Sequence, residues 1–169
     1  MFIELHAASA FSFLEAASLP ETLVERAAAL GYSALALVDR DGVCGAPRFH
    51  KAAKAAGLKA IIGCEITIVD SSQYSVASRR QLAAPEPAGR PSGEGGKPED
   101  GLSPPASRLQ PLAPSRWRLP VLVESRQGYQ NLCRLLTRMK LRAPKGEGAL
   151  SLDELDGSTA GLIAIVGRE

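Results

Sequence analysis

The chain has 169 residues, of which 45% are hydrophobic and 22% are charged, with a formal net charge of +2. This composition suits one soluble domain, and it excludes a membrane-spanning protein because no run approaches the ~18 consecutive apolar residues that a spanning helix needs. The small net charge disfavours a dedicated DNA groove, and the three scattered cysteines do not form a disulfide framework, so we expect a cytoplasmic protein without a membrane partner.

Residues 1–70 alternate apolar strands with amphipathic helices. Strands are predicted at Phe2–Leu5, Ala34–Val38 and Leu58–Ile62, with Ile66–Val69 as an extension of the third. A capping box at Ser18–Glu21 predicts a first helix that ends at Gly31. The second helix is predicted to begin at Pro47 and to end at Gly57. The continuous apolar strands indicate a β-α-β-α-β unit with parallel strands, the α/β class.

Residues 71–116 interrupt this pattern. They hold eight of the twelve prolines and five glycines, with a single aromatic residue, Tyr74. Such a segment buries too little apolar surface to offset its ordering entropy, so we expect a disordered Pro/Gly-rich insertion. The alternative is a proline-rich docking peptide.

Residues 117–169 resume the globular pattern. Leu119–Val123 is predicted as a strand, and a leucine stripe predicts a helix over Tyr129–Leu141. A second capping box is expected at Ser151–Glu154, followed by a buried strand at Gly161–Val166. A parallel α/β unit that ends on a strand without its covering helix is expected to be a truncated domain.

Potential metal ligands follow the predicted strands. His6, Asp39 and Glu65 come at the carboxyl ends of the first three strands, and Glu15 lies in the loop after His6. Reactive groups of parallel α/β folds gather at this edge, and imidazole with carboxylates suits zinc, manganese or iron. The alternative is that Asp39 and Glu65 only cap loops or helix starts.

A stripe of arginines recurs on the helix predicted over Tyr129–Leu141. Arg134, Arg138 and Arg142 lie on the face opposite the leucines. This spacing is typical of a solvated helix face, and weak contact with a nucleic acid or a partner is the alternative.

Several segments resemble the PHP (polymerase and histidinol phosphatase) domain of bacterial C-family DNA polymerases, the DNA polymerase III alpha subunit and its error-prone relatives. The three PHP motifs are matched, in order, by Glu4–Glu15, Ala34–Gly45 and Gly57–Glu65. Two further segments resemble the polymerase version in particular, Gly128–Leu136 and Gly161–Gly167. The resemblance implies the first part of a β/α barrel. The parent activity that it implies is DNA synthesis by a nucleotidyltransferase, in replication or damage-tolerant repair.

The sequence departs from the family's ligand pattern at two positions. Ala8 and Arg40 stand where the family has histidines, while the acidic positions are kept as Glu15 and Glu65. The resemblance therefore implies a degenerate metal site made of His6, Glu15, Asp39 and Glu65, with no catalytic residue. We expect no cofactor, or zinc or manganese if the site is active.

The implied role is an accessory or structural module of a polymerase. Its partners would be the rest of a polymerase III-type polypeptide or replication and repair proteins, with DNA reached indirectly. Two alternatives are a free-standing metal-dependent phosphoesterase or 3′–5′ exonuclease, and an inactive, decayed fragment.

Overall fold

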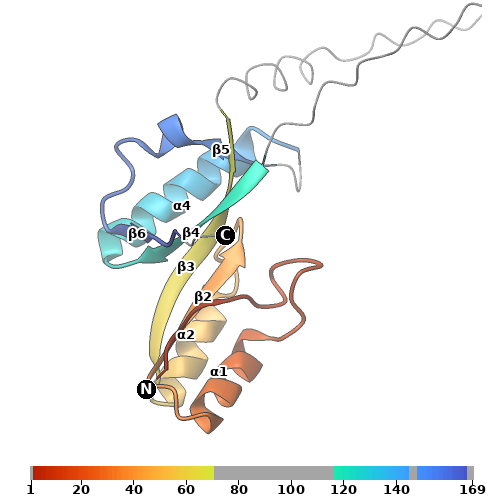
Figure 1. Cartoon of the computed structure of the whole chain (residues 1–169), viewed down its shortest axis with the longest axis vertical. Helices are drawn as coiled ribbons and strands as arrows, with labels where there is room; N and C mark the ends of the chain where they lie inside the picture. The colour runs from red at the N-terminus through yellow and green to blue at the C-terminus, as the bar shows by residue number, and fades with distance from the viewer. Residues whose placement is uncertain (1, 71–115, 145–147, 167–169) are drawn as a thin grey trace, which may run out of the picture.

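The structure, a computed structural model, describes residues 2–70, 116–144 and 148–166 (Figure 1). A six-stranded sheet runs in the order β1-β2-β3-β4-β6, with β5 paired to β3. The strands are β1 (Glu4–Ala7), β2 (Ala34–Arg40), β3 (Lys59–Val69), β4 (Arg116–Val123), β5 (Leu150–Ser151) and β6 (Leu162–Ala164). The helices are α1 (Pro20–Ala29), α2 (Ala46–Ala55), α4 (Arg126–Leu141) and the 3₁₀ helix η1 (Leu152–Leu155). None of the described helices is long and apolar enough to cross a membrane.

The helices α1, α2 and α4 pack on the same face of the sheet, at opposite ends of the long strand β3 (Figure 1). Leu35 and Leu37 of β2 pack with α1 and α2, whereas Cys64 and Ile66 of β3 pack with α4. Leu37 pairs with Ile62, and Ile62 lies two residues before Cys64. Side chains two residues apart point to the same face of a sheet, so Leu37 and Cys64 share one face. The intervening positions, among them Arg40, therefore lie on the face opposite the helices.

Strand directions confirm part of the sequence prediction. The pairs β1–β2, β2–β3 and β3–β5 are parallel, as expected of β/α units. The pairs β3–β4 and β4–β6 are antiparallel, so the sheet is mixed. A continuous apolar run indicates that both faces of a strand are buried. It does not indicate whether the strand runs parallel or antiparallel to its neighbour.

The boundaries show further corrections. The Ser18–Glu21 capping box is not formed: Leu19 is the N-cap of α1, and the Glu21 carboxylate binds Arg48 instead. The Ser151–Glu154 capping box is present. The strand predicted as buried at Gly161–Val166 is short and half-exposed.

Two other predicted boundaries also shift. The helix predicted from Tyr129 begins at Arg126, where the Ser125 hydroxyl accepts a hydrogen bond from the Gly128 amide. Arg116, assigned to the insertion, begins β4, and the rest of the predicted insertion lies outside the described residues.

Candidate functional site

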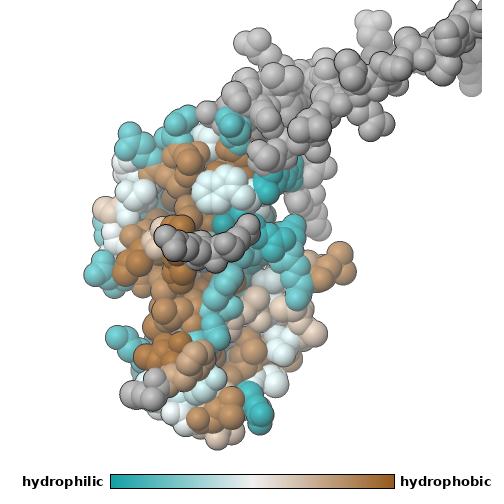
Figure 2. All heavy atoms as spheres, viewed as in Figure 1, coloured by the Kyte–Doolittle hydropathy of each residue, from teal (hydrophilic) through white to brown (hydrophobic). Residues whose placement is uncertain are grey.

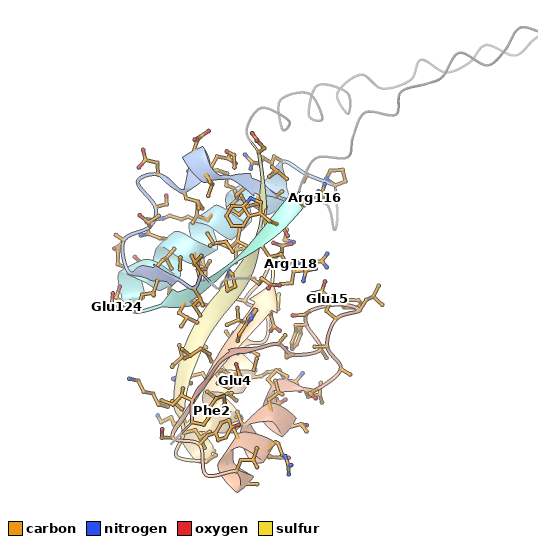
Figure 3. The ribbon with its side chains drawn as sticks, viewed as in Figure 1. Phe2, Glu4, Glu15, Arg116, Arg118 and Glu124 are labelled. Carbon is orange, nitrogen blue, oxygen red and sulfur yellow. The ribbon has the colours of Figure 1, made fainter. Side chains whose placement is uncertain are left out.

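Five side chains from four strands and one loop meet on the sheet face opposite the helices. They are His6 of β1, Glu15 of the loop after β1, Arg40 of β2, Glu65 of β3 and Arg118 of β4. The strand register brings them together. Arg40 of β2 pairs with Glu65 of β3. Thr67, which lies two residues after Glu65 and on the same face of β3, pairs with Arg118 of β4. Figure 3 shows Glu15 and Arg118 beside each other.

Arg118 links two carboxylates that come from different parts of the chain. Its Nη1 donates to Glu15 Oε2 at 3.0 Å and to Glu65 Oε2 at 3.2 Å. Its Nη2 also donates to Glu15 Oε1. Arg40 Nη1 makes a second ion pair with that Glu15 oxygen, and His6 Nε2 lies 3.1 Å from Glu65 Oε1. The result is one continuous chain of contacts from His6 to Arg40.

The two guanidinium groups dominate the electrostatics of this network. Burial raises the pKa of Glu15, but the hydrogen bonds and charges of Arg40 and Arg118 outweigh burial, so the pKa lies below its ordinary value. The hydrogen bond to Glu15 raises the pKa of Arg118 in turn. At neutral pH, Glu15 is therefore an anion held between cations, with its lone pairs used by N–H donors.

Asp39 lies apart from this network and holds the loop after β1. Its side chain is buried, and its Oδ1 accepts hydrogen bonds from the Ser9 amide at 2.7 Å and the Ser12 hydroxyl at 2.9 Å. The Ser9 hydroxyl donates to the same carboxylate, 2.9 Å from Oδ2. The Ser12 oxygen also accepts the Arg40 amide at 3.0 Å. Asp39 is therefore satisfied within the protein.

The turn after β2 fixes the backbone that carries Arg40. Asp41 adopts a positive φ of 49°, a conformation that aspartate tolerates better than most residues. Its carboxylate accepts hydrogen bonds from the Thr67 amide and hydroxyl, both at 2.8 Å, and its amide donates to the Glu65 carbonyl. These bonds tie the end of β2 to β3.

Residues 4–168 match the family model of the PHP domain. The chain belongs to the PHP domain family. It is 37% identical over 155 residues to an error-prone DNA polymerase of Ralstonia nicotianae, covering 91% of this chain and 11% of that protein. An error-prone DNA polymerase of Nocardia farcinica is 36% identical over 164 residues, with 94% of this chain and 14% of that protein covered. The chain thus spans between a tenth and a seventh of the length of these relatives.

A solved structure shows a weaker likeness to this PHP domain. It is a putative metal-dependent phosphoesterase from Bifidobacterium adolescentis, 17% identical, with a TM-score of 0.47. The match covers 82% of this chain and 33% of that one.

The residues of this PHP domain do not fit the metal centre that the family implies. Within the described residues, no group of three or more His, Cys, Asp or Glu side chains is placed to hold a metal ion. The structure brings His6, Glu15 and Glu65 together, but Arg40 and Arg118 bind the two carboxylates. A guanidinium group has only N–H donors and no lone pair to offer a metal ion, so neither arginine can become a ligand.

Arg118 is the member of the network that the sequence pattern does not indicate. The predicted strand begins one residue later, at Leu119. The signal was the pair Arg116 and Arg118, which are two residues apart and so share one face of a strand. Only the antiparallel pairing of β4 with β3 shows that this face meets Glu65.

The predicted arginine stripe of α4 is used unevenly. Arg142 donates to both carboxylate oxygens of Glu154 and to the Ala149 carbonyl, which ties the end of α4 to η1. The hydrogen bond from Arg142 lowers the pKa of Glu154. Arg134 contacts Asn131 at 3.4 Å, and Arg138 is exposed. Contact of these arginines with a nucleic acid stays a prediction.

Proposed function

We propose that the chain is the PHP region of an error-prone, polymerase III alpha-type DNA polymerase and that it acts as a metal-independent structural module in DNA replication or repair. The curated relatives named above support the parent polymerase. In this proposal the partner is the remainder of the polymerase polypeptide, DNA is reached only indirectly, and the protein is cytoplasmic. Among the α4 arginines, Arg134 and Arg138 are candidates for weak nucleic-acid contact.

The observation that supports a structural role is that Glu15 and Glu65 form ion pairs with the guanidinium groups of Arg40 and Arg118. Phosphodiester hydrolysis in a metal site needs an ion that lowers the pKa of a bound water and neutralises the phosphate. Arg40 could neutralise phosphate charge, but an arginine cannot ligate and activate water as a metal does. Each carboxylate of the network, Glu15 and Glu65, is paired with an arginine, so neither is free to act as a general base.

A nuclease assay tests the absence of hydrolysis. Labelled single-stranded and primed DNA is incubated with the whole chain and manganese or zinc, and with Glu65→Gln as the matched control. We expect no metal-dependent shortening with either protein. Shortening by the natural sequence that is lost in Glu65→Gln would instead establish the 3′–5′ exonuclease or phosphoesterase.

A chimera tests the polymerase role. The matching N-terminal region of the Ralstonia nicotianae enzyme is replaced by residues 4–168 of this chain, and primer extension is measured. We expect the chimera to extend primers, whereas a chimera with Phe49→Ala, which empties a fully buried position between α2 and the sheet, should lose yield and activity. A folded chimera that cannot extend a primer would contradict the role.

A further inference from the structure

The loop between β1 and α1, residues 8–19, is fixed to the sheet at two points. Near its start, the serines at 9 and 12 bind the buried Asp39 carboxylate. Further along, Glu15 binds Arg40 and Arg118. Ala10 donates to the Ser18 carbonyl at 2.8 Å, which closes the base of the loop. Hydrogen bonds therefore hold the base, and ion pairs hold the outer part.

The outer part of this loop has little apolar contact to keep it in place. Phe13 is 83% exposed and Leu14 is 101% exposed, and Leu14 adopts a positive φ of 64°. Figure 2 shows apolar atoms projecting from the body where the loop projects in Figure 1. A non-glycine residue at positive φ is strained, and exposed apolar groups contribute no burial energy. The amides of Glu15 and Ala16 donate to the Ser12 carbonyl within the loop, and the described side-chain contacts that join the outer part to the strands are the ion pairs of Glu15.

We propose that Arg118, supported by Arg40, is a built-in cation that takes the structural place of a metal ion, holding the loop against the sheet by joining Glu15 to Glu65. The proposal deepens the metal-independent function proposed above and rests on it. A metal ion joins acidic ligands from separate elements by placing one positive centre between them. Arg118 Nη1 does this with carboxylates 50 residues apart in the chain, at 3.0 and 3.2 Å.

The same geometry has a consequence for restoring the family's ligands. Histidines at positions 8 and 40 would restore the two ligand positions that the family resemblance assigns to the first two motifs, beside His6, Glu15 and Glu65. The guanidinium of Arg118 would still lie between both carboxylates, where it blocks their lone pairs and repels a divalent cation. Histidine replacement is therefore insufficient while Arg118 is present.

Limited proteolysis of the whole chain measures how firmly the loop is docked. Phe13 is exposed even in the docked loop, but chymotrypsin must draw an extended stretch of backbone into its cleft, and Glu15 holds the neighbouring backbone on the sheet. The rate of release of the fragment ending at Phe13 should therefore rise as the ion pairs of Glu15 are broken. Arg118→Gln is compared with Arg116→Gln, a change of the same type on the same face of β4; the described contacts of Glu15 and Glu65 do not include Arg116. Far-ultraviolet circular dichroism confirms that each variant is folded.

We expect Arg118→Gln to accelerate this cleavage by about three- to tenfold, the range for a partly exposed ion-pair network. Arg116→Gln should leave the rate unchanged, and high salt should bring the natural sequence towards the Arg118→Gln rate. A chelator should have no effect. Equal rates for the two variants, or acceleration of the natural sequence by a chelator, would overturn the proposal.

A second comparison uses zinc as the probe. The variant Ala8→His with Arg40→His is compared with the same variant carrying Arg118→Gln as well. We expect zinc to slow the cleavage after Phe13 in the triple variant and not in the double variant. An equal zinc response in the two variants, present or absent, would contradict the place assigned to Arg118. Because neither readout involves DNA, failure here is distinguishable from failure of the polymerase role in the chimera.

Discussion

Replacement of Asp39 separates a structural carboxylate from a metal ligand. The side chain is 2% exposed, and its oxygens receive the Ser9 amide, the Ser9 hydroxyl and the Ser12 hydroxyl at 2.7 to 3.0 Å. Both serines are themselves buried, so water has poor access to the donors that Asp39→Ala would leave behind. The variant should therefore lose stability even in the complete absence of metal.

The magnitude follows from those donors. Each buried donor left without a partner costs about 1–3 kcal/mol, and partial relaxation of the loop favours the lower end of that range. For the Ser9 amide and the hydroxyls of Ser9 and Ser12 together, we expect Asp39→Ala to lower the free energy of unfolding by about 3–5 kcal/mol. Asp39→Asn retains an oxygen acceptor of similar shape, so its expected loss is about 1–2 kcal/mol.

Urea unfolding followed by circular dichroism, with a chelator present, measures both losses. If the free energies of unfolding of Asp39→Ala and the natural sequence agree within about 1 kcal/mol, then the hydrogen bonds of Asp39 do not hold the loop and the reasoning is wrong. A loss that appears only when zinc is supplied would likewise identify Asp39 as a metal ligand.

Further predictions concern single side chains. The pKa of Glu15 is lowered below 4.5 in the folded chain, so its contribution to stability is present above that pH and is lost as the pH falls through the folded pKa. Glu15→Gln should therefore reduce the loss of unfolding free energy at acid pH. Parallel plots of unfolding free energy against pH for the two proteins would contradict the ion pairs. Gly45→Ala should cost about 1–3 kcal/mol in thermal or urea unfolding, since its Cβ would lie 2.9 Å from Asp39 Oδ2 although φ is an ordinary −75°; a stabilised variant would contradict this packing. Burial raises the pKa of the Cys64 thiol to about 12, so mass spectrometry of the native chain after alkylation at mildly alkaline pH should find Cys44 modified and Cys64 intact; equal modification would show that Cys64 is accessible.

Much of the fold could be predicted because local patterns determine it. The buried strand β2 is a continuous apolar run, and the leucine stripe of α4 predicts its buried face. The antiparallel direction of β4 could not be predicted, because it depends on a connection that carries no apolar pattern and on pairing with residues about fifty positions earlier. The Ser18–Glu21 motif failed because α1 begins at Pro20 with Leu19 as its N-cap, and the Glu21 carboxylate binds Arg48 of α2 in a tertiary contact.

The site could be predicted only where local motifs define it. Arg40 could be recognised because it stands inside a motif, and its nearness to Glu15 and Glu65 follows from the strand order. Arg118 comes from outside the motifs, and only the register of β4 brings it to Glu65. Asp39 comes directly after its predicted strand, as a ligand would, but the serines of the loop use its oxygens, and residue spacing carries no information on such partners.

Isothermal titration of the whole, chelator-treated chain with zinc and then with manganese tests most directly whether arginines have replaced the metal at this site. With Glu15 and Glu65 bound by Arg40 and Arg118, the titration should show no stoichiometric site of sub-micromolar affinity, and His6→Ala should give the same trace. A stoichiometric, sub-micromolar site that disappears in His6→Ala would contradict it, because a metal would then displace both guanidinium groups from their carboxylates.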